Sequence, residues 1–364
     1  MISNLDLLLA ASKPGDTIQL ERGVYTTIGC STNPNPDGQP LKQGVSLIGR
    51  GRDTVVLSIR PMEDSQLDTS VVLGTGDNVI SDLTIDCNVT GSPNRKRNGA
   101  YCRGVNNRIE RVHCKRPYGV WAKEFRESFA LAVQLDDPNS SITDCVVSNS
   151  IGSYQTFIQG HTVKNCHVEG SYERRDDVGF RMAYNVGKSK GSLLSNCTAS
   201  YVTAGVYCDE PSDGITVEDC EFHCVRNGLF FNAQQPTGEN PLRRTFRNVV
   251  FRRNSVYLDP TRAGASGILL EHIKEGGGEP NQNSICDVLV SENEFLLVPG
   301  LAPVGDVFAF NVATLVRREL VNDDLGISKV RFINNVMDPR MRLRNHQRNA
   351  DVTGTVLKTL EFEA

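Results

Sequence analysis

The stretch "GVYCDEP" at residues 205–211 places a phenol and carboxylic acids close together on one predicted strand. Side chains alternate between the two faces of a strand, so Val206 and Cys208 can face a core while Tyr207 and Asp209 face outward. A phenol and a carboxylate on an outer face are groups that transfer protons. This stretch therefore predicts a candidate catalytic surface.

Related stretches occur elsewhere in the chain, namely "GFRMAYN" from 179, "GLFFNAQ" from 228, "GILLEHI" from 267 and "VFAFNVA" from 307. Aligned with the first stretch, their outward positions form two columns. The first column holds Arg181, Tyr207, Phe230 and Leu269, and the second holds Ala183, Asp209, Asn232 and Glu271. Parallel strands lie about 4.8 Å apart. The polar members are therefore expected to surround one sugar-sized position.

A second series of strands carries a cysteine at a fixed place. It comprises "SSITDCVV" from 140, "HTVKNCHV" from 161, "SLLSNCTA" from 192 and "ITVEDCEF" from 215, with weaker copies such as "FRNVVF" at 246. The cysteines are Cys145, Cys166, Cys197 and Cys220. The position before the cysteine holds Asp82, Asp144, Asn165, Asn196, Asp219, Asn248 and Asn334 across the copies. Such side chains at a recurring turn can bond the backbone and one another along a stack.

Short strands repeating every 21–31 residues are typical of a parallel β-solenoid. The apolar spacing is two rather than 3.6, which disfavours a helical repeat. Because each coil buries its inward side chains on its neighbours, a long chain can form one core. We predict an all-β protein with a single domain over 1–364. Its cap covers about 1–25, its coils about 16–340, and a C-terminal cap or tail about 340–364.

The first sixty residues carry a more specific signal, "LLLAASKPGDTIQLERGVYTT" followed by "LKQGVSLIGRGRDTVVLSI". This opening resembles that of pectin-lyase-like right-handed parallel β-helix proteins. The positions that match are Pro14, Gly15, Asp16, Ile18, Leu20, Gly23 and Tyr25. The resemblance implies a right-handed parallel β-helix (β-solenoid) with a short capping helix at 4–12. The superfamily contains lyases, hydrolases, epimerases, esterases, tailspikes and binding proteins, so the fold does not select an activity.

The resemblance also implies a cleft along the outer face of one sheet, walled by long turns. The turn "SYERRDDVGFR" at 171–181 is rich in arginine, which suits bidentate binding of carboxylates. The turn "KRPYGVWAKEFRES" at 115–128 holds the single tryptophan. The predicted substrate-binding residues are Arg174, Arg175, Asp176, Asp177, Asn232, Trp121 and Lys123.

Three functions fit these residues. A polysaccharide lyase acting by β-elimination on a uronic-acid glycan would use Arg181 for the carboxylate and Tyr207 for the proton. A glycoside hydrolase would use two carboxyls, with Asp209 and Glu271 as candidates. The third alternative is a non-catalytic glycan-binding or phage-fibre-like β-helix, which would allow a monomer or a homotrimer. The sequence analysis favours the lyase, although the motifs of known uronan-acting β-helix families, such as Gly-His-Gly, are absent.

The composition limits the partners. A net charge of −4 argues against a general nucleic-acid binder, and no 20-residue apolar run predicts a membrane span. The N-terminus lacks a basic leader, so no signal peptide is predicted. Eleven cysteines without a CxxC pair favour free core thiols and a reducing, cytoplasmic compartment.

Metal binding is weakly indicated. The six histidines include no close pair and are expected to be solvated. A Ca²⁺ ion held by the oxygens of Asp176, Asp177 and Asp209 is the one cofactor that the acidic residues allow.

Overall fold

The structure is a computed structural model that describes part of the chain. The described residues are 2–31, 38–60, 69–89, 97–119, 130–135, 139–149, 151–152, 155–170, 181–186, 190–208, 212–234, 245–274, 284–316, 319–320, 327–345, 351–353 and 356–357. They fall into two compact units, Met1–Tyr184 and Asn185–Ala364. Each unit is a stack of parallel coils and is described by itself. The prediction of a single domain therefore stays a prediction.

The first unit begins with the only helix among the described residues, α1 (Leu5–Ala11). Asn4 caps it, because its Oδ1 accepts a hydrogen bond from the Asp6 amide at 2.8 Å. Leu5 and Leu9 are buried, so the helix turns an apolar side toward the first coils. The predicted capping helix is confirmed.

Two sheets run through the first unit. Sheet A contains β1 (Ile2–Asn4), β2 (Thr17–Gln19), β3 (Gly23–Thr27), β5 (Ser46–Ile48), β6 (Thr54–Ser58), β8 (Val79–Asp86), β10 (Arg108–Lys115), β13 (Ser141–Thr143), β14 (Val146–Ser148), β17 (Thr162–Lys164) and β18 (His167–Glu169). Sheet B contains β4 (Cys30–Ser31), β7 (Thr69–Gly74), β9 (Arg97–Cys102), β11 (Tyr118–Gly119), β12 (Ala130–Leu135), β15 (Ile151–Gly152) and β16 (Gln155–Gln159). The first four residues of β19 (Arg181–Asn185) are the last of this unit. The strands within sheet A pair in parallel.

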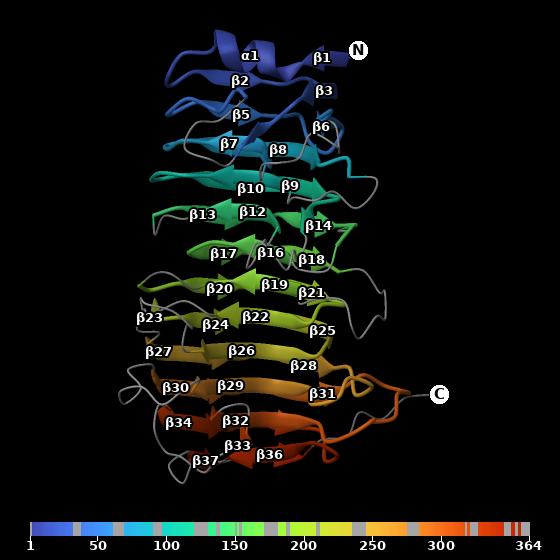
Figure 1. The fold of residues 1–364 in the computed structure, drawn as a ribbon, viewed down its shortest axis with the longest axis vertical. Coiled ribbons are helices and arrows are strands. Elements are labelled where there is room, and N and C mark those ends of the chain that lie inside the picture. Colours follow the sequence, from blue (N-terminus) through green and yellow to red (C-terminus); the bar gives the residue numbers. More distant parts are fainter. Residues whose placement is uncertain are drawn as a thin grey trace. The chain divides into compact units, whose positions relative to one another are not determined.

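The strands of the second unit likewise belong to sheet A or sheet B. Sheet A contains β20 (Leu193–Ser195), β21 (Thr198–Ser200), β23 (Ser212–Asp213), β24 (Thr216–Glu218), β25 (Glu221–Val225), β27 (Thr245–Arg252), β28 (Ser255–Leu258), β30 (Ser284–Ser291), β31 (Glu294–Leu297), β34 (Ile327–Ile333), β35 (Val336–Met337), β37 (Asp351–Thr353) and β38 (Val356–Leu357). Sheet B contains β22 (Ala204–Cys208), β26 (Asn227–Gln234), β29 (Ser266–Lys274), β32 (Phe308–Val316), β33 (Glu319–Leu320) and β36 (Arg342–Asn345). Figure 1 shows β22, β26, β29 and β32 stacked in chain order in this unit.

The cysteine positions of the repeat lie in the core. The flanking strand registers align Cys145 with Cys166 in the first unit, and Cys197 with Cys220 in the second. All four are buried free thiols, as predicted. Each follows a residue with positive φ, such as Asp219 at 56°. Asp and Asn tolerate this left-handed conformation better than most residues, which explains their recurrence before the cysteine.

One repeat copy was misaligned. The copy "FRNVVF" predicts Asn248 at the position before the cysteine, but the structure pairs Glu218 with Arg252 and bonds the Cys220 amide to Asn254. Asn254 therefore lies at the position that Cys220 occupies in the preceding coil, and the following coils have asparagine at this position as well. The predicted register failed here because this coil has two residues with positive φ, Asn248 at 56° and Arg253 at 53°, and the pairing of Glu218 with Arg252 puts Arg253 beside Asp219.

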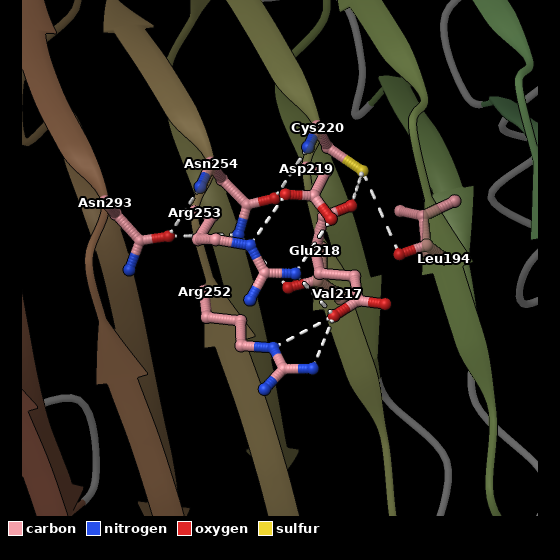
Figure 2. A network of polar contacts seen from close by, with 9 residues as sticks. All are labelled: Leu194, Val217, Glu218, Asp219, Cys220, Arg252, Arg253, Asn254 and Asn293. Atoms are coloured by element: carbon pink, nitrogen blue, oxygen red, sulfur yellow. Dashed lines mark hydrogen bonds and ion pairs between the residues drawn. The ribbon is translucent and has the colours of Figure 1, made fainter.

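A buried ladder of Asn254, Asn293 and Asn335 continues the cysteine column, and Figure 2 shows its first two members. The Oδ1 of Asn293 accepts from the amide and the Nδ2 of Asn254, at 2.9 and 3.0 Å. Its own Nδ2 donates to the Phe251 carbonyl at 3.0 Å and to Asn335 Oδ1 at 2.9 Å. Each rung ties a coil to the one before it.

Ion pairs join the turns outside this ladder (Figure 2). Arg253 donates to both carboxylate oxygens of Asp219, at 2.8 and 2.9 Å, and Arg252 donates to Glu218 at 2.9 Å. The hydrogen bond from Arg253 lowers the pKa of Asp219. Polar groups on this edge of the second unit are therefore paired from one coil to the next.

Candidate functional site

The members of the predicted columns that lie in the described part of the second unit are aligned along sheet B. Tyr207 aligns with Phe230, Phe230 with Leu269, and Leu269 with Asn311. In the second column Asn232 aligns with Glu271. We call this surface, formed by β22, β26, β29 and β32, the B face.

Glycines bend the strands that carry the B face. A Cβ added to Gly205, Gly228 or Gly267 would lie 2.6, 2.8 or 2.3 Å from the side chain of Phe222, Val256 or Phe295, all of which are core residues. These glycines therefore face the core. The apolar residue that follows each glycine is also fully buried, as Val206 and Ile268 show. Two successive residues thus point inward at the bend.

This bend moves the residue before each glycine to the outer side. The corresponding residue in β32 is Phe308, which aligns with Ser266 and is followed by Ala309. Arg344 Cζ lies 4.1 Å from the ring centroid of Phe308, whereas Phe310 packs on core residue Phe332 with centroids 5.0 Å apart. Asn311 Nδ2 also reaches Ser266 Oγ at 3.4 Å. Since Ser266 aligns with Phe308 and Asn227, this register adds Asn227 to the B face.

The B face carries three amide oxygens without donors. Among the residues that the structure describes, nothing donates a hydrogen bond to Oδ1 of Asn227, Asn232 or Asn311. Asn227 and Asn311 are nearly fully buried, with exposed fractions of 3% and 7%. A buried acceptor without a donor costs about 1–3 kcal/mol. Each of these oxygens is buried from solvent, so the three together mark a part of sheet B where polar groups are enclosed without a donor among the described residues.

Glu271 lies beside Asn232 on the next coil and is partly buried. Burial raises the pKa of its carboxyl, and the positive charge of Arg226 acts in the opposite direction. A carboxyl with a raised pKa keeps its proton to higher pH and can donate it. Glu271 therefore remains a candidate proton donor.

Tyr207 is less accessible than the sequence suggests. It lies in the predicted column, on the face opposite the buried Val206 and Cys208, but only 8% of it is exposed. Its ring meets the ring of Phe230 edge to face, with centroids 5.3 Å apart. Phe230 and Tyr207 together make an apolar floor beside the polar column.

Arg181 begins β19 in the first unit and is partly buried. Met182 and Tyr184 of the same strand are buried, and the Tyr184 hydroxyl donates to the Cys166 carbonyl at 2.9 Å. The alternation of β19 therefore turns Arg181 to the side opposite the core, as predicted.

Other predicted site residues lie outside the described residues. They are Asp209, Arg174, Arg175, Asp176, Asp177, Trp121 and Lys123. The residues considered for Ca²⁺ are all in this group. Among the described residues, no three His, Cys, Asp or Glu side chains gather in an arrangement that would hold a metal ion. No helix in the described part of the chain is long and apolar enough to span a membrane.

Asn227 and Asn311 were not among the residues predicted for the site. Asn311 stands in the quoted stretch "VFAFNVA", at the position aligned with Leu269, and a longer alignment of the column would have found it. Asn227 immediately precedes the glycine of "GLFFNAQ". Strict alternation assigns it to the core side, so only the bend in the strand reveals its place.

Comparison with known proteins agrees with this architecture. A family model described as "Right handed beta helix region" matches residues 98–272. No curated protein sequence matches the chain.

Solved structures are similar in fold at low identity. The tailspike protein of E. coli bacteriophage HK620, in complex with a pentasaccharide, is 14% identical with a TM-score of 0.54, covering 98% of this chain and 60% of the tailspike chain. The catalytic domain of a GH87 α-1,3-glucanase, in complex with nigerose, is 12% identical with a TM-score of 0.52, covering 94% of this chain and 61% of that one. The A-module of Azotobacter vinelandii mannuronan C-5 epimerase AlgE6 is 16% identical with a TM-score of 0.41, covering 98% and 94%.

The chain thus spans about three fifths of the length of the tailspike and the glucanase domain. These similarities establish the fold and its handedness. The stacked parallel coils, the capping helix and the matched region show that this chain has the right-handed parallel β-helix fold.

Proposed function

We propose that this protein binds a polysaccharide on the B face and cleaves it, with Glu271 as the proton donor. The observation that carries the proposal is the pairing of Glu271, whose pKa is raised by burial, with Asn232, whose amide oxygen has no donor among the described residues. Both lie next to the apolar side chains of Leu269 and Phe230. Apolar floors with a few directed polar groups are typical of sugar-binding surfaces.

The similar structures support a carbohydrate ligand. The HK620 tailspike is in complex with a pentasaccharide and the GH87 glucanase domain with nigerose, and both share this fold over most of the present chain. Their ligands are properties of those proteins. For this chain they support a glycan as the class of partner that the B face receives.

A hydrolase mechanism fits Glu271 best. The protonated Glu271 carboxyl would donate its proton to the glycosidic oxygen as the bond to the anomeric carbon breaks. A second carboxylate must then activate water or attack the anomeric carbon, and Asp209 is the residue that the sequence offers for that role. Asn232 would bind a ring hydroxyl and position the sugar next to Glu271.

A lyase that cleaves uronic-acid glycans is the second candidate, and the outward, partly buried position of Arg181 on β19 favours it. In that reaction Arg181 would neutralise the substrate carboxylate while a base removes the neighbouring proton. Arg174 and Arg175 would assist from the preceding turn. A β-helix that binds glycan without cleaving it, as a monomer or a homotrimer, would leave both reactions undetected.

A screen of neutral and acidic polysaccharides tests the proposal. Cleavage is measured as new reducing ends, and β-elimination as ultraviolet absorbance of an unsaturated product. On any polymer that is cleaved, Glu271→Gln should reduce turnover by about 10²–10⁴-fold, the usual contribution of a general acid. Glu169→Gln, on the exposed surface of β18, is the matched control and should have wild-type activity.

Two results would contradict the proposal. Undiminished turnover of Glu271→Gln would remove Glu271 from the mechanism. Cleavage with ultraviolet absorbance that depends on Arg181 and not on Glu271 would replace the hydrolase with the lyase.

A further inference from the structure

The outer face of sheet A in the second unit carries a pair of stacked aromatic rings. His223 of β25 and Tyr257 of β28 are aligned on successive coils, and their ring centroids lie 4.4 Å apart at an interplanar angle of 6°. Both rings point away from the core, because the preceding residues, Phe222 and Val256, are fully buried. We call His223 and Tyr257 the ring stack. The proposed cleavage reaction uses neither ring.

The ring stack is closed at one end and open at the other. Tyr257 aligns on the next coil with Leu296, a large side chain that is buried. His223 aligns on the preceding coil with Ser200, whose side chain is small, and Tyr257 is the only ring among the described residues that stacks on His223. Coils are spaced by about 4.8 Å, so a third ring beside Ser200 would continue the stack at nearly the same separation. The ring face of His223 toward Ser200 is therefore a place for a ligand ring.

A carboxylate borders this open end. Glu221 precedes His223 by two residues on the same face of β25, and its Oε1 lies 2.5 Å from Nε2 of His223. Nearly half of each of these two side chains is exposed, so both can be reached from solvent. No other group in the described part of the chain bonds to the Glu221 carboxylate, which leaves its second oxygen as an acceptor. A carboxylate accepts hydrogen bonds from hydroxyl groups and repels phosphate.

We propose that the ring stack and Glu221 form a second carbohydrate site, in which one pyranose ring packs on His223 beside Ser200 and donates a hydroxyl hydrogen bond to Glu221. A pyranose has an apolar C–H face for the imidazole and hydroxyl donors at its rim, whereas a nucleotide would bring a phosphate toward the carboxylate. The site lies on sheet A, and the residues of the proposed cleavage lie on sheet B. Its role is to hold a glycan away from the bond that is cleaved, and it can bind a sugar whether or not Glu271 acts.

Histidine-ring NMR gives a readout at the site itself. The chain has six histidines, so selective ¹³C labelling of histidine gives a small set of ring signals, and His223→Ala identifies the signal of His223. The methyl glycosides of D-glucose, D-galactose and D-mannose are titrated into the full chain. Adenosine monophosphate is the planar, phosphorylated comparison ligand.

We expect at least one glycoside to move the His223 signal in a saturable manner. Ser200→Trp fills the position of the ligand ring and should abolish this response, whereas the matched control Ser200→Ala leaves the position open and should keep the affinity within about twofold. Glu221→Ala should weaken the affinity by about tenfold or more, because a charge-assisted hydrogen bond is lost. The melting temperature of each variant is measured alongside, so that loss of binding is separated from loss of the fold.

A His223 signal that no glycoside moves, or one that still moves in Ser200→Trp, would overturn this proposal. A larger response to adenosine monophosphate than to any glycoside would also overturn it, since the site would then take a planar ligand. The polysaccharide screen is scored separately. Cleavage that depends on Glu271, together with a His223 signal that does not respond, would keep the proposed function and remove this second site.

Discussion

Two regions of the second unit contain the same kinds of polar residue in different hydrogen-bonding states. One is the edge of sheet A formed by Asp219, Arg253, Asn254 and Asn293, called the turn edge, and the other is the B face. At the turn edge, Arg253 is bonded to Asp219 and Asn293 forms hydrogen bonds to the coils before and after it. On the B face, Asn232 and Asn311 have amide oxygens that nothing in the described part of the chain satisfies. Residue type alone therefore does not distinguish a structural polar group from one available to a ligand. The hydrogen-bond partners do distinguish the two regions, because an unpaired buried acceptor costs stability and a paired one does not.

The largest difference in stability should come from exchanging one asparagine in each region. Asn293→Ala removes a buried side chain with several hydrogen bonds and leaves the amide of Asn254 without its acceptor. We expect it to lower the free energy of unfolding by about 3–5 kcal/mol. Asn232→Ala should change the same quantity by less than about 1 kcal/mol, because the Oδ1 of Asn232 accepts no hydrogen bond from the described residues.

Urea unfolding of the two variants measures the comparison. Equal destabilisation by both substitutions would show that Asn232 is a structural residue, and the distinction between the two regions would not hold.

A smaller effect is expected from the bend that shapes the B face. Gly267→Ala would place a Cβ 2.3 Å from the Phe295 ring and 2.6 Å from the Ala309 carbonyl oxygen. Overpacking of this kind destabilises by about 1–3 kcal/mol. Gly305→Ala is the matched control, since nothing lies within 4 Å of its added Cβ. Thermal unfolding should separate the two, and a harmless Gly267→Ala would show that the strand does not bend inward there.

The smallest effects concern pH and have opposite signs in the two regions. The hydrogen bond from Arg253 lowers the pKa of Asp219 in the folded protein, so this pair stabilises the fold above the ordinary Asp pKa of about 4 and ceases to do so as the pH falls through the lowered value. Both side chains are about two-fifths exposed, so the effect is that of a surface pair. Asp219→Asn should lower the free energy of unfolding by about 0.2–1 kcal/mol at pH 7 and by nothing near pH 2.

Glu271 should show the reverse dependence. Its folded-state pKa is raised by burial, so its contribution to stability is greatest below the ordinary Glu pKa of about 4.3 and is lost as the pH rises through the raised value. Glu271→Gln should therefore be slightly more stable than the wild type at pH 7 and equal to it near pH 3. Chemical unfolding of the wild type and Glu271→Gln at pH 3 and pH 7 measures this difference. A lower stability of Glu271→Gln at pH 7 would contradict the raised pKa of Glu271.

Much of this architecture was accessible from the sequence. The capping helix, the parallel coils, the buried cysteines and the alignment of Tyr207 with Phe230 and Leu269 all follow from periodicity and the opening motif. These features depend on the alternation of apolar residues within a strand and on the repeat, and both can be recognised in the amino-acid sequence. The outward position of Glu271 beside Asn232 was predicted in the same way.

Two features were not accessible, for physical reasons. Asn254 occupies a cysteine position in the core, where its amide bonds to the neighbouring coil. A polar residue in a repeat is usually assigned to a turn, so its place in the core was not predicted. Asn227 lies outside because Gly228 turns inward against Val256, which breaks the alternation on which strand prediction relies. Both depend on contacts between coils, which a single coil's sequence does not contain.

The asparagine ladder has a consequence for how such a protein changes length. The Nδ2 groups of Asn254, Asn293 and Asn335 each donate to a carbonyl of the preceding coil, those of Val217, Phe251 and Val290. Their Oδ1 atoms accept the amides of Cys220, Asn254 and Asn293 in the same way. These three junctions between coils are therefore made by the same pair of hydrogen bonds. A duplicated coil with its own asparagine could be inserted between two of these coils and would form the same hydrogen bonds to both neighbours. A gene that encodes this fold can therefore gain a whole coil without interrupting the asparagine ladder.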